Sequence, residues 1–152
     1  MKKALIVLMA IFSFTSLSAQ DFGDFKSYEL TAKAWDAAAA NDHKLVMAYT
    51  NKCIEMYMAQ AKKMQASLSE LPKGSQEEVS KLWALNDVGT CLFIQGESLI
   101  KNGDKEGAIK AFKTLTQELK YAQCWDTSGW FWQPAGAAKQ KIVELEFEQS
   151  DF

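Results

Sequence analysis

The chain has 152 residues, with 17 basic and 19 acidic side chains and a formal net charge of −2 at neutral pH. Every basic residue is Lys, so the chain lacks the guanidinium fork that recognises phosphates and guanine bases. This composition argues against a nucleic-acid partner, and the lack of a basic cluster in the sequence argues against binding to an anionic membrane surface.

The N-terminal 19 residues have the pattern of a secretory signal peptide. Two lysines precede an apolar stretch over residues 4–14, and small residues follow over 16–19. The apolar stretch is shorter than the about 20 residues that a membrane-spanning helix needs. We therefore predict cleavage after Ala19 and a single exported domain over residues 20–152, periplasmic or secreted, with no membrane attachment after cleavage.

Three cysteines are an odd number for a protein in an oxidising compartment. Cys53 and Cys91 occupy positions where helical spacing predicts apolar residues, which favours small core residues. A disulfide between two of Cys53, Cys91 and Cys124 is the alternative interpretation.

Apolar residues recur with helical spacing along nearly the whole chain, and no stretch shows sustained alternation, so the sequence predicts an all-α fold. We expect a first helix over residues 24–40, with Asp24 as its N-cap and with one apolar face. That face is formed by Tyr28, Ala32, Trp35 and Ala39. After a break at residues 41–42, a second helix is expected over 43–67.

The remaining helices are predicted from their end signals. Ser75 and Glu78 have the spacing of a capping box, which starts a third helix that continues to about residue 101. Gly103 ends that helix, and Asp104 caps a fourth helix over residues 105–119. Pro134 fits the first position of a last helix, which is expected to reach about residue 147.

Three residues carry a repeat pattern. The spacing of Gly96, Ala108 and Phe112 matches the tetratricopeptide (TPR) pattern of two packed helices. In that pattern the glycine lets the two helices approach, the alanine lies at their crossing, and the phenylalanine packs against the next repeat. Other apolar positions of the pattern are occupied by Leu92, Leu99 and Leu115.

The chain therefore resembles TPR-like helical hairpins over residues 86–119, and more weakly over 24–67. The expected architecture is about two right-handed helical hairpins followed by a C-terminal capping helix. Gln95 and Lys120 depart from the pattern, because Leu and Pro are usual at those positions. From Leu85 to Trp132 the chain also resembles small exported bacterial TPR-containing proteins, some labelled "beta-glucanase precursor" and some associated with polysaccharide loci.

The glucanase label would need two carboxyl groups across a sugar-binding cleft. Candidate acids are Asp87, Asp126 and the C-terminal glutamates Glu144, Glu146 and Glu148. The glutamates are typical of a solvated helix face, and Asp126 is typical of a turn.

Metal and nucleophile chemistry also lack a motif. The single histidine, His43, is expected at a helix start, and the spacing of the cysteines shows no metal motif. We therefore predict a protein that is not an enzyme, with no catalytic residues, no metal and no cofactor.

The tryptophan-rich segment is the strongest candidate binding feature. Trp125, Trp130, Phe131 and Trp132 either close the end of the helical stack or present faces to a ligand. If this segment is extended, Trp130 and Trp132 point to one side and Phe131 to the other.

The leading functional hypothesis is an interaction module that binds a protein or peptide in the groove of its hairpins. The expected groove residues, exposed on the first helix of the second hairpin, are Asn86, Thr90 and Glu97. The alternative is a polysaccharide-binding accessory protein that uses Trp125, Trp130 or Trp132. Self-association is a third possibility, because two repeats are fewer than the three usually needed for a stable array.

Overall fold

The computed structural model describes residues 20–150, so the predicted signal peptide lies outside the described residues. Within this range no helix is both long and apolar enough to cross a membrane. The helices are α1 (Ser27–Ala39), α2 (His43–Ala66), α3 (Gln76–Ser80), α4 (Trp83–Lys101), α5 (Lys105–Glu118) and α6 (Pro134–Ser150). The two short strands are β1 (Cys124–Asp126) and β2 (Trp130–Trp132).

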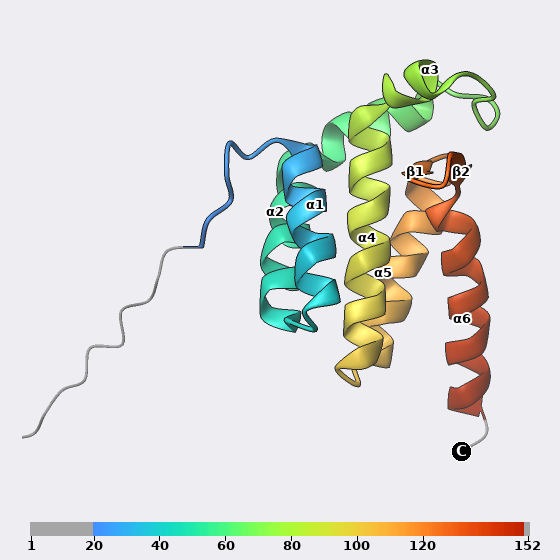
Figure 1. Cartoon of the computed structure of the whole chain (residues 1–152). Helices are drawn as coiled ribbons and strands as arrows, with labels where there is room; N and C mark the ends of the chain where they lie inside the picture. Colours follow the sequence, from blue (N-terminus) through green and yellow to red (C-terminus); the bar gives the residue numbers. More distant parts are fainter. Residues whose placement is uncertain (1–19, 151–152) are drawn as a thin grey trace, which may run out of the picture.

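The long helices form two layers, with α1, α4 and α6 in one and α2 and α5 in the other (Figure 1). α1 and α2 pack against each other as one hairpin, and α4 and α5 as the next. α4 lies at the centre, because it packs against α1, α2, α5 and α6. The structure is mostly helical and thus confirms the predicted all-α class.

The core lies around α4, and neighbouring segments approach α4 most closely at two of its glycines. A Cβ atom added to Gly96 would overlap the buried ring of Phe112 on α5. A Cβ atom at Gly89 would likewise overlap the side chain of Ala122, just after α5. The predicted role of Gly96 is therefore confirmed: it allows α4 and α5 to come together. All six positions of the repeat pattern are buried: Leu92, Gly96, Leu99, Ala108, Phe112 and Leu115.

Three predicted helix starts are confirmed by side-chain caps. The Asp42 carboxylate accepts from the backbone N–H of Leu45 at 3.0 Å at the start of α2. Asp104 accepts from Gly107 at 2.8 Å at the start of α5. Ser75 and Glu78 form the reciprocal capping box that the sequence predicts. These caps satisfy N–H groups that have no partner within the helix.

The predicted start of the first helix is wrong. α1 begins at Ser27, with Lys26 as its N-cap, and Asp24 does not cap it. Instead the Asp24 carboxylate pairs with the Lys26 ammonium at 3.3 Å. The reason lies in the backbone, because Gly23 and Phe25 have φ angles of +61° and +59°, and this left-handed conformation is incompatible with a helix.

The predicted apolar face of α1 is also wrong. Tyr28, Ala32, Trp35 and Ala39 are all exposed. The buried residues of α1 lie on another face and include two hydroxyl side chains: they are Ser27, Leu30, Thr31, Ala34 and Ala37. Small residues pack there because α1 lies close to both α2 and α4.

The predicted third helix is divided into α3 and α4. In a continuous helix the Val79 carbonyl would accept from the backbone N–H of Trp83. Here it accepts from the Asn86 side-chain amide at 2.9 Å and from the Leu82 backbone N–H at 3.1 Å. Asn86 thus supplies a second donor to the Val79 carbonyl in place of the Trp83 N–H, at the break between the two helices.

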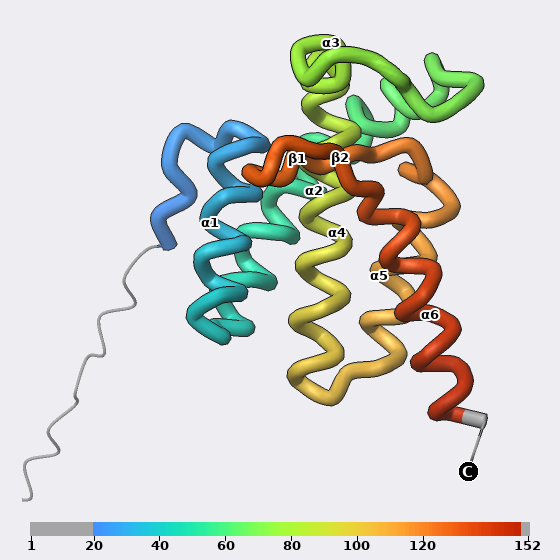
Figure 2. Tube along the Cα trace, turned by 45° about the vertical axis from the view of Figure 1, so that its right-hand side comes forward, coloured from blue at the N-terminus to red at the C-terminus, as the bar shows by residue number. Residues whose placement is uncertain are grey.

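The tryptophan-rich segment is a β-hairpin that crosses the upper end of α4 towards α1 (Figure 2). Trp125 pairs with Phe131, and Cys124 pairs with Trp132. The turn is closed by Asp126, whose side chain accepts from the Ser128 backbone N–H at 2.7 Å, which confirms Asp126 as a turn residue. Strands of three residues are too short for alternation to be visible in the sequence.

Candidate functional site

A pocket of about 350 Å³ lies where the β-hairpin meets α1 and α4. Figure 2 shows the β-hairpin, which contributes to this lining, lying across the upper end of α4 towards α1. Its lining residues come from α1, from the α3–α4 segment and from the hairpin with the residue before it. They are Ser27, Tyr28, Thr31, Ser80, Trp83, Asn86, Asp87, Thr90, Gln123, Cys124, Trp125 and Phe131.

Four aromatic residues line this pocket; Phe131 is half-buried, and the other three are exposed. Tyr28 on α1 is 58% exposed, Trp83 on α4 is 42% exposed, and Trp125 on β1 is 39% exposed. Two of them are braced by a second ring in edge-to-face contact. The Trp83 ring lies 5.5 Å from the ring of Tyr57, and the Trp125 ring lies 4.8 Å from that of Phe131. These contacts hold large apolar surfaces ready for a ligand at low cost in conformational entropy.

Asp87 is the only charged side chain that lines the pocket. It is half-buried, and its carboxylate accepts a hydrogen bond of 2.5 Å from the Ser27 hydroxyl. Burial raises the Asp87 pKa to about 6, and the Ser27 hydrogen bond opposes this rise. Among residues 20–150, no Lys or His forms an ion pair with Asp87. A buried acid with a shifted pKa in a cleft is a recognised mark of functional sites.

Two amide side chains position the hairpin beside the pocket. The Asn86 amide oxygen accepts from the backbone N–H of Gln123 at 2.9 Å. The Gln123 side chain donates to the carbonyl of Pro72 at 3.0 Å. Asn86 therefore holds both the end of α3 and the start of the hairpin. Its amide serves the architecture of the pocket, in addition to lining it.

The expected groove residues do not form one exposed surface, and the prediction that Thr90 is exposed is wrong. Thr90 is only 2% exposed, because α4 is covered by its neighbours on several sides, and its hydroxyl donates to the Asn86 carbonyl. Asn86 and Glu97 are half-buried. Asn86 and Thr90 line the pocket, whereas Glu97 lies outside it and forms an ion pair of 3.6 Å with Lys141 on α6.

The three tryptophans of the hairpin have different surroundings. Trp132 is half-buried, with its ring 5.1 Å from that of Phe93 on α4, so it covers the end of the helical core. Trp125 lines the pocket, and Trp130 is 54% exposed outside its lining. The two alternatives for this segment therefore both apply in part: Trp132 closes the end of the core, and Trp125 and Trp130 leave ring surface open.

The cysteines are free thiols, and the expectation that Cys53 and Cys91 are core residues is confirmed. Burial raises the pKa of the Cys91 thiol well above its usual value. Cys124 lines the pocket, and burial raises its pKa as well. Both thiols are therefore neutral at physiological pH and are weak nucleophiles.

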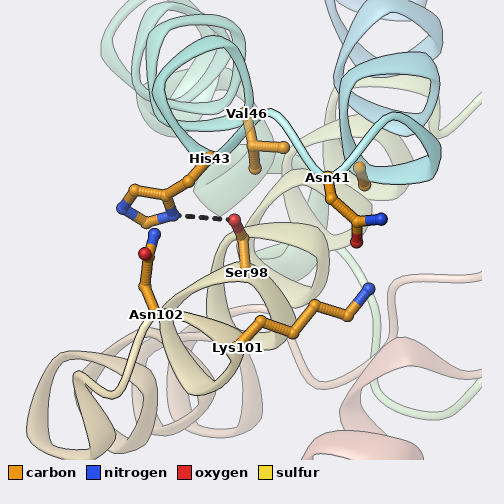
Figure 3. A pocket seen from close by; sticks show the side chains of 7 residues that line it. Asn41, His43, Val46, Ser98, Lys101 and Asn102 are labelled. Atoms are coloured by element: carbon orange, nitrogen blue, oxygen red, sulfur yellow. Dashed lines mark hydrogen bonds between the residues drawn. The ribbon is translucent and has the colours of Figure 1, made fainter.

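A second pocket, of about 270 Å³, lies at the opposite end, where the α1–α2 turn meets the end of α4 (Figure 3). The His43 ring nitrogen Nδ1 lies 2.8 Å from the Ser98 hydroxyl, which links α2 to α4. Asn41, Lys101 and Asn102 complete its polar lining. Because its lining has no Phe, Tyr or Trp, this pocket offers less apolar surface to a ligand than the hairpin pocket.

Sequence reasoning missed Tyr28, Trp83 and the pocket position of Asp87. Tyr28 was placed on the buried face, and Trp83 was placed inside a continuous helix. For Tyr28 a signal was present in the composition of α1, because this helix carries two large aromatic residues on a face whose other members are alanines. A helix that packs by small residues places its large ones elsewhere.

The chemistry-bearing side chains of the described residues are few at this pocket. Within residues 20–150, no group of three or more His, Cys, Asp or Glu side chains is placed to hold a metal ion. The pocket lining holds a single carboxyl group, whereas the usual glycosidase arrangement needs two. Comparison of the chain with protein-family models, with curated proteins and with solved structures gave no match.

Proposed function

We propose that this chain is an exported, non-enzymatic interaction module of the TPR-like class, which holds a segment of a partner protein or peptide. The observation that carries this proposal is the pocket between α1, α4 and the hairpin, whose lining contains three exposed aromatic rings and one carboxylate. Protein interfaces concentrate their binding energy in aromatic anchors at such pockets.

The packing of the helices supports the TPR-like part of the proposal. α4, the first helix of the second hairpin, packs on both helices of the first hairpin. α6 packs on α5 and, over a smaller contact, on α4. Each hairpin is thus covered by the helix that follows it, which is the logic of stacked helical repeats. In such a stack the layer of α1, α4 and α6 is the surface on which a ligand segment would lie.

The shape of the site supports a peptide ligand. The hairpin crosses one end of the α1–α4 layer and makes a wall there, so a segment lying along the helices would meet the pocket at that end. Asn86, Gln123 and Ser80 supply polar atoms at the lining, and the rings supply apolar surface. Peptide recognition commonly relies on pockets that receive individual side chains of the peptide.

The test is selection of peptides from a random display library on the purified protein, followed by affinity measurement with two tryptophan variants. Trp125→Ala removes a pocket ring, and Trp130→Ala removes a more exposed ring outside the pocket lining in the same hairpin. We expect Trp125→Ala to weaken the selected peptides by about tenfold or more and Trp130→Ala to leave them within about twofold. Equal losses in the two variants, or no selected peptide, would contradict the proposal.

A polysaccharide-binding role is the second candidate, and a specific observation favours it. Trp125 and Trp130 both keep exposed ring surface in one hairpin, and indole faces stack on sugar rings. A glycan array probed with the same two variants separates the candidates. Binding to glycans that is lost in both variants, together with no peptide binding, would favour this second role.

A further inference from the structure

The hairpin pocket combines an acid with aromatic walls and has no cation in its lining. Asp87 is the only charged residue among those that line it. Its carboxylate has one hydrogen-bond partner, the Ser27 hydroxyl, and no ion pair with any described residue. A carboxylate that is partly removed from water gains most from a partner of opposite charge.

The aromatic rings favour the same kind of partner. The faces of Tyr and Trp rings carry negative potential and attract ammonium groups. The Tyr28 ring already has a cation near it, because the Lys26 ammonium lies 5.9 Å from its centre. That lysine is engaged with Asp24 and Glu29, at 3.3 Å and 3.7 Å, and leaves the Asp87 carboxylate available.

We infer that the pocket binds an organic ammonium group, supplied as a lysine side chain of the bound partner segment. The inference rests on the proposed peptide-binding function and names the side chain that anchors the peptide. The ammonium pairs with Asp87, and the four methylene groups of the lysine pack between the rings of Tyr28, Trp83 and Trp125. The volume of about 350 Å³ is within the range of small-ligand sites.

Other kinds of anchor fit this lining less well. An acidic side chain would meet the Asp87 carboxylate with no lysine in the lining to offset the repulsion. A purely apolar side chain would displace water from Asp87 and leave it with the Ser27 hydroxyl alone. A lysine satisfies both the charge and the apolar walls, because its stem is apolar and its head is charged.

The experiment uses NMR titration of the indole N–H signals of Trp83 and Trp125 in the purified protein. The probes are the tripeptide acetyl-Gly-Lys-Gly-amide and its norleucine counterpart, which has an apolar stem and no ammonium. Asp87→Asn removes the charge and keeps an acceptor for Ser27, and Asp36→Asn, on the exposed surface of α1, is the matched control. Tyr28→Leu is the second variant, chosen at an exposed position where folding tolerates change.

We expect the lysine peptide to bind at least about tenfold more tightly than the norleucine peptide, and Asp87→Asn to abolish this preference while Asp36→Asn retains it. Tyr28→Leu should weaken the lysine peptide about two- to fivefold. Equal affinity for the two peptides would overturn the inference and leave the peptide-binding function intact. Unchanged lysine preference in Asp87→Asn would also overturn it.

An amino sugar is another source of an ammonium group, and a separate titration tests it. Glucosamine and glucose are titrated in the same way. Shifts at Trp83 and Trp125 with glucosamine, but with neither tripeptide, would overturn both the lysine assignment and the peptide-binding function in favour of an amino-sugar ligand.

Discussion

At neutral pH the Asp87 carboxylate lowers the stability of the folded protein, because it is charged and partly buried. Burial raises its pKa from 3.8 to about 6, so the native state binds this proton more tightly than the unfolded state does. Stability from this group is therefore greatest below about pH 4 and falls as the pH rises through 6. The groups around it do not offset this cost, because its partner Ser27 is neutral and burial keeps the Cys91 and Cys124 thiols protonated. Such a residue is typical of a binding site.

The first prediction follows from the direction of the Asp87 pKa shift. At pH 7 the free energy of unfolding of Asp87→Asn should be about 1–2 kcal/mol higher than that of the wild type, after allowance for the partial exposure of the side chain. Near pH 3.5 most of this difference should have disappeared, because the carboxyl is then largely protonated in both states. Urea unfolding at the two pH values measures this. A variant that is less stable than the wild type at pH 7 would refute the account of Asp87.

At the scale of elements, α4 has glycines at the two positions where its neighbours pack most closely. Gly96 and Gly89 let α5 and the residue Ala122 lie against its backbone. Of its first residues, Asn86 links α3 to the hairpin, and Trp83 and Asp87 enter the pocket. The same helix thus carries the packing of the second hairpin and one wall of the candidate site.

The second prediction concerns Gly96. Gly96→Ala should destabilise the protein by about 1–3 kcal/mol, because the new methyl group meets the buried Phe112 ring, although Ala favours helices by about 1 kcal/mol. Gly136→Ala in α6 is the control, since a Cβ atom there would lie at an ordinary 3.8 Å from Gln133. It should stabilise the protein or leave it unchanged. Thermal unfolding of both variants checks this, and a neutral Gly96→Ala would mean that α4 and α5 are farther apart than described.

The third prediction concerns the link between α4 and the hairpin. Asn86→Ala removes the acceptor for the Gln123 N–H, and leaving such a buried group without a partner costs about 1–3 kcal/mol. It also removes one donor to the Val79 carbonyl, which keeps the Leu82 N–H. We expect faster amide exchange at Gln123 and lower stability, with Gln117→Ala, on the exposed face of α5, as the control. Unchanged exchange at Gln123 would show that other contacts hold the hairpin in place.

At the scale of the whole molecule, most helix starts were predictable from the sequence because the signals at helix ends are local, whereas the break between α3 and α4 was not predicted. Asp42, Ser75, Asp104 and Pro134 mark helix starts through hydrogen bonds or geometry within a few residues, and all four starts were predicted correctly. The start of α1 was missed because two left-handed residues before it are a backbone property that Asp24 alone does not reveal.

The site was less predictable because it depends on contacts between distant segments. Ser27 and Asp87 are 60 residues apart in the chain, and their hydrogen bond has no local signature. Tyr28 is apolar enough to be assigned to a core, and only the packing of α1 by small residues shows why it faces solvent. The hairpin tryptophans were identified as candidates from their clustering, but which ring is covered depends on Phe93 in α4.

The most direct test of the central claim, that the hairpin pocket is the ligand site, uses the five tryptophans as reporters. Their indole N–H signals, assigned with single Trp→Phe variants, are followed during titration with the tightest peptide from the display selection. Our account predicts that Trp83 and Trp125 shift together on one binding curve while Trp35 on the outer face of α1 does not. Shifts at Trp35 or Trp130, with Trp83 and Trp125 unchanged, would contradict it.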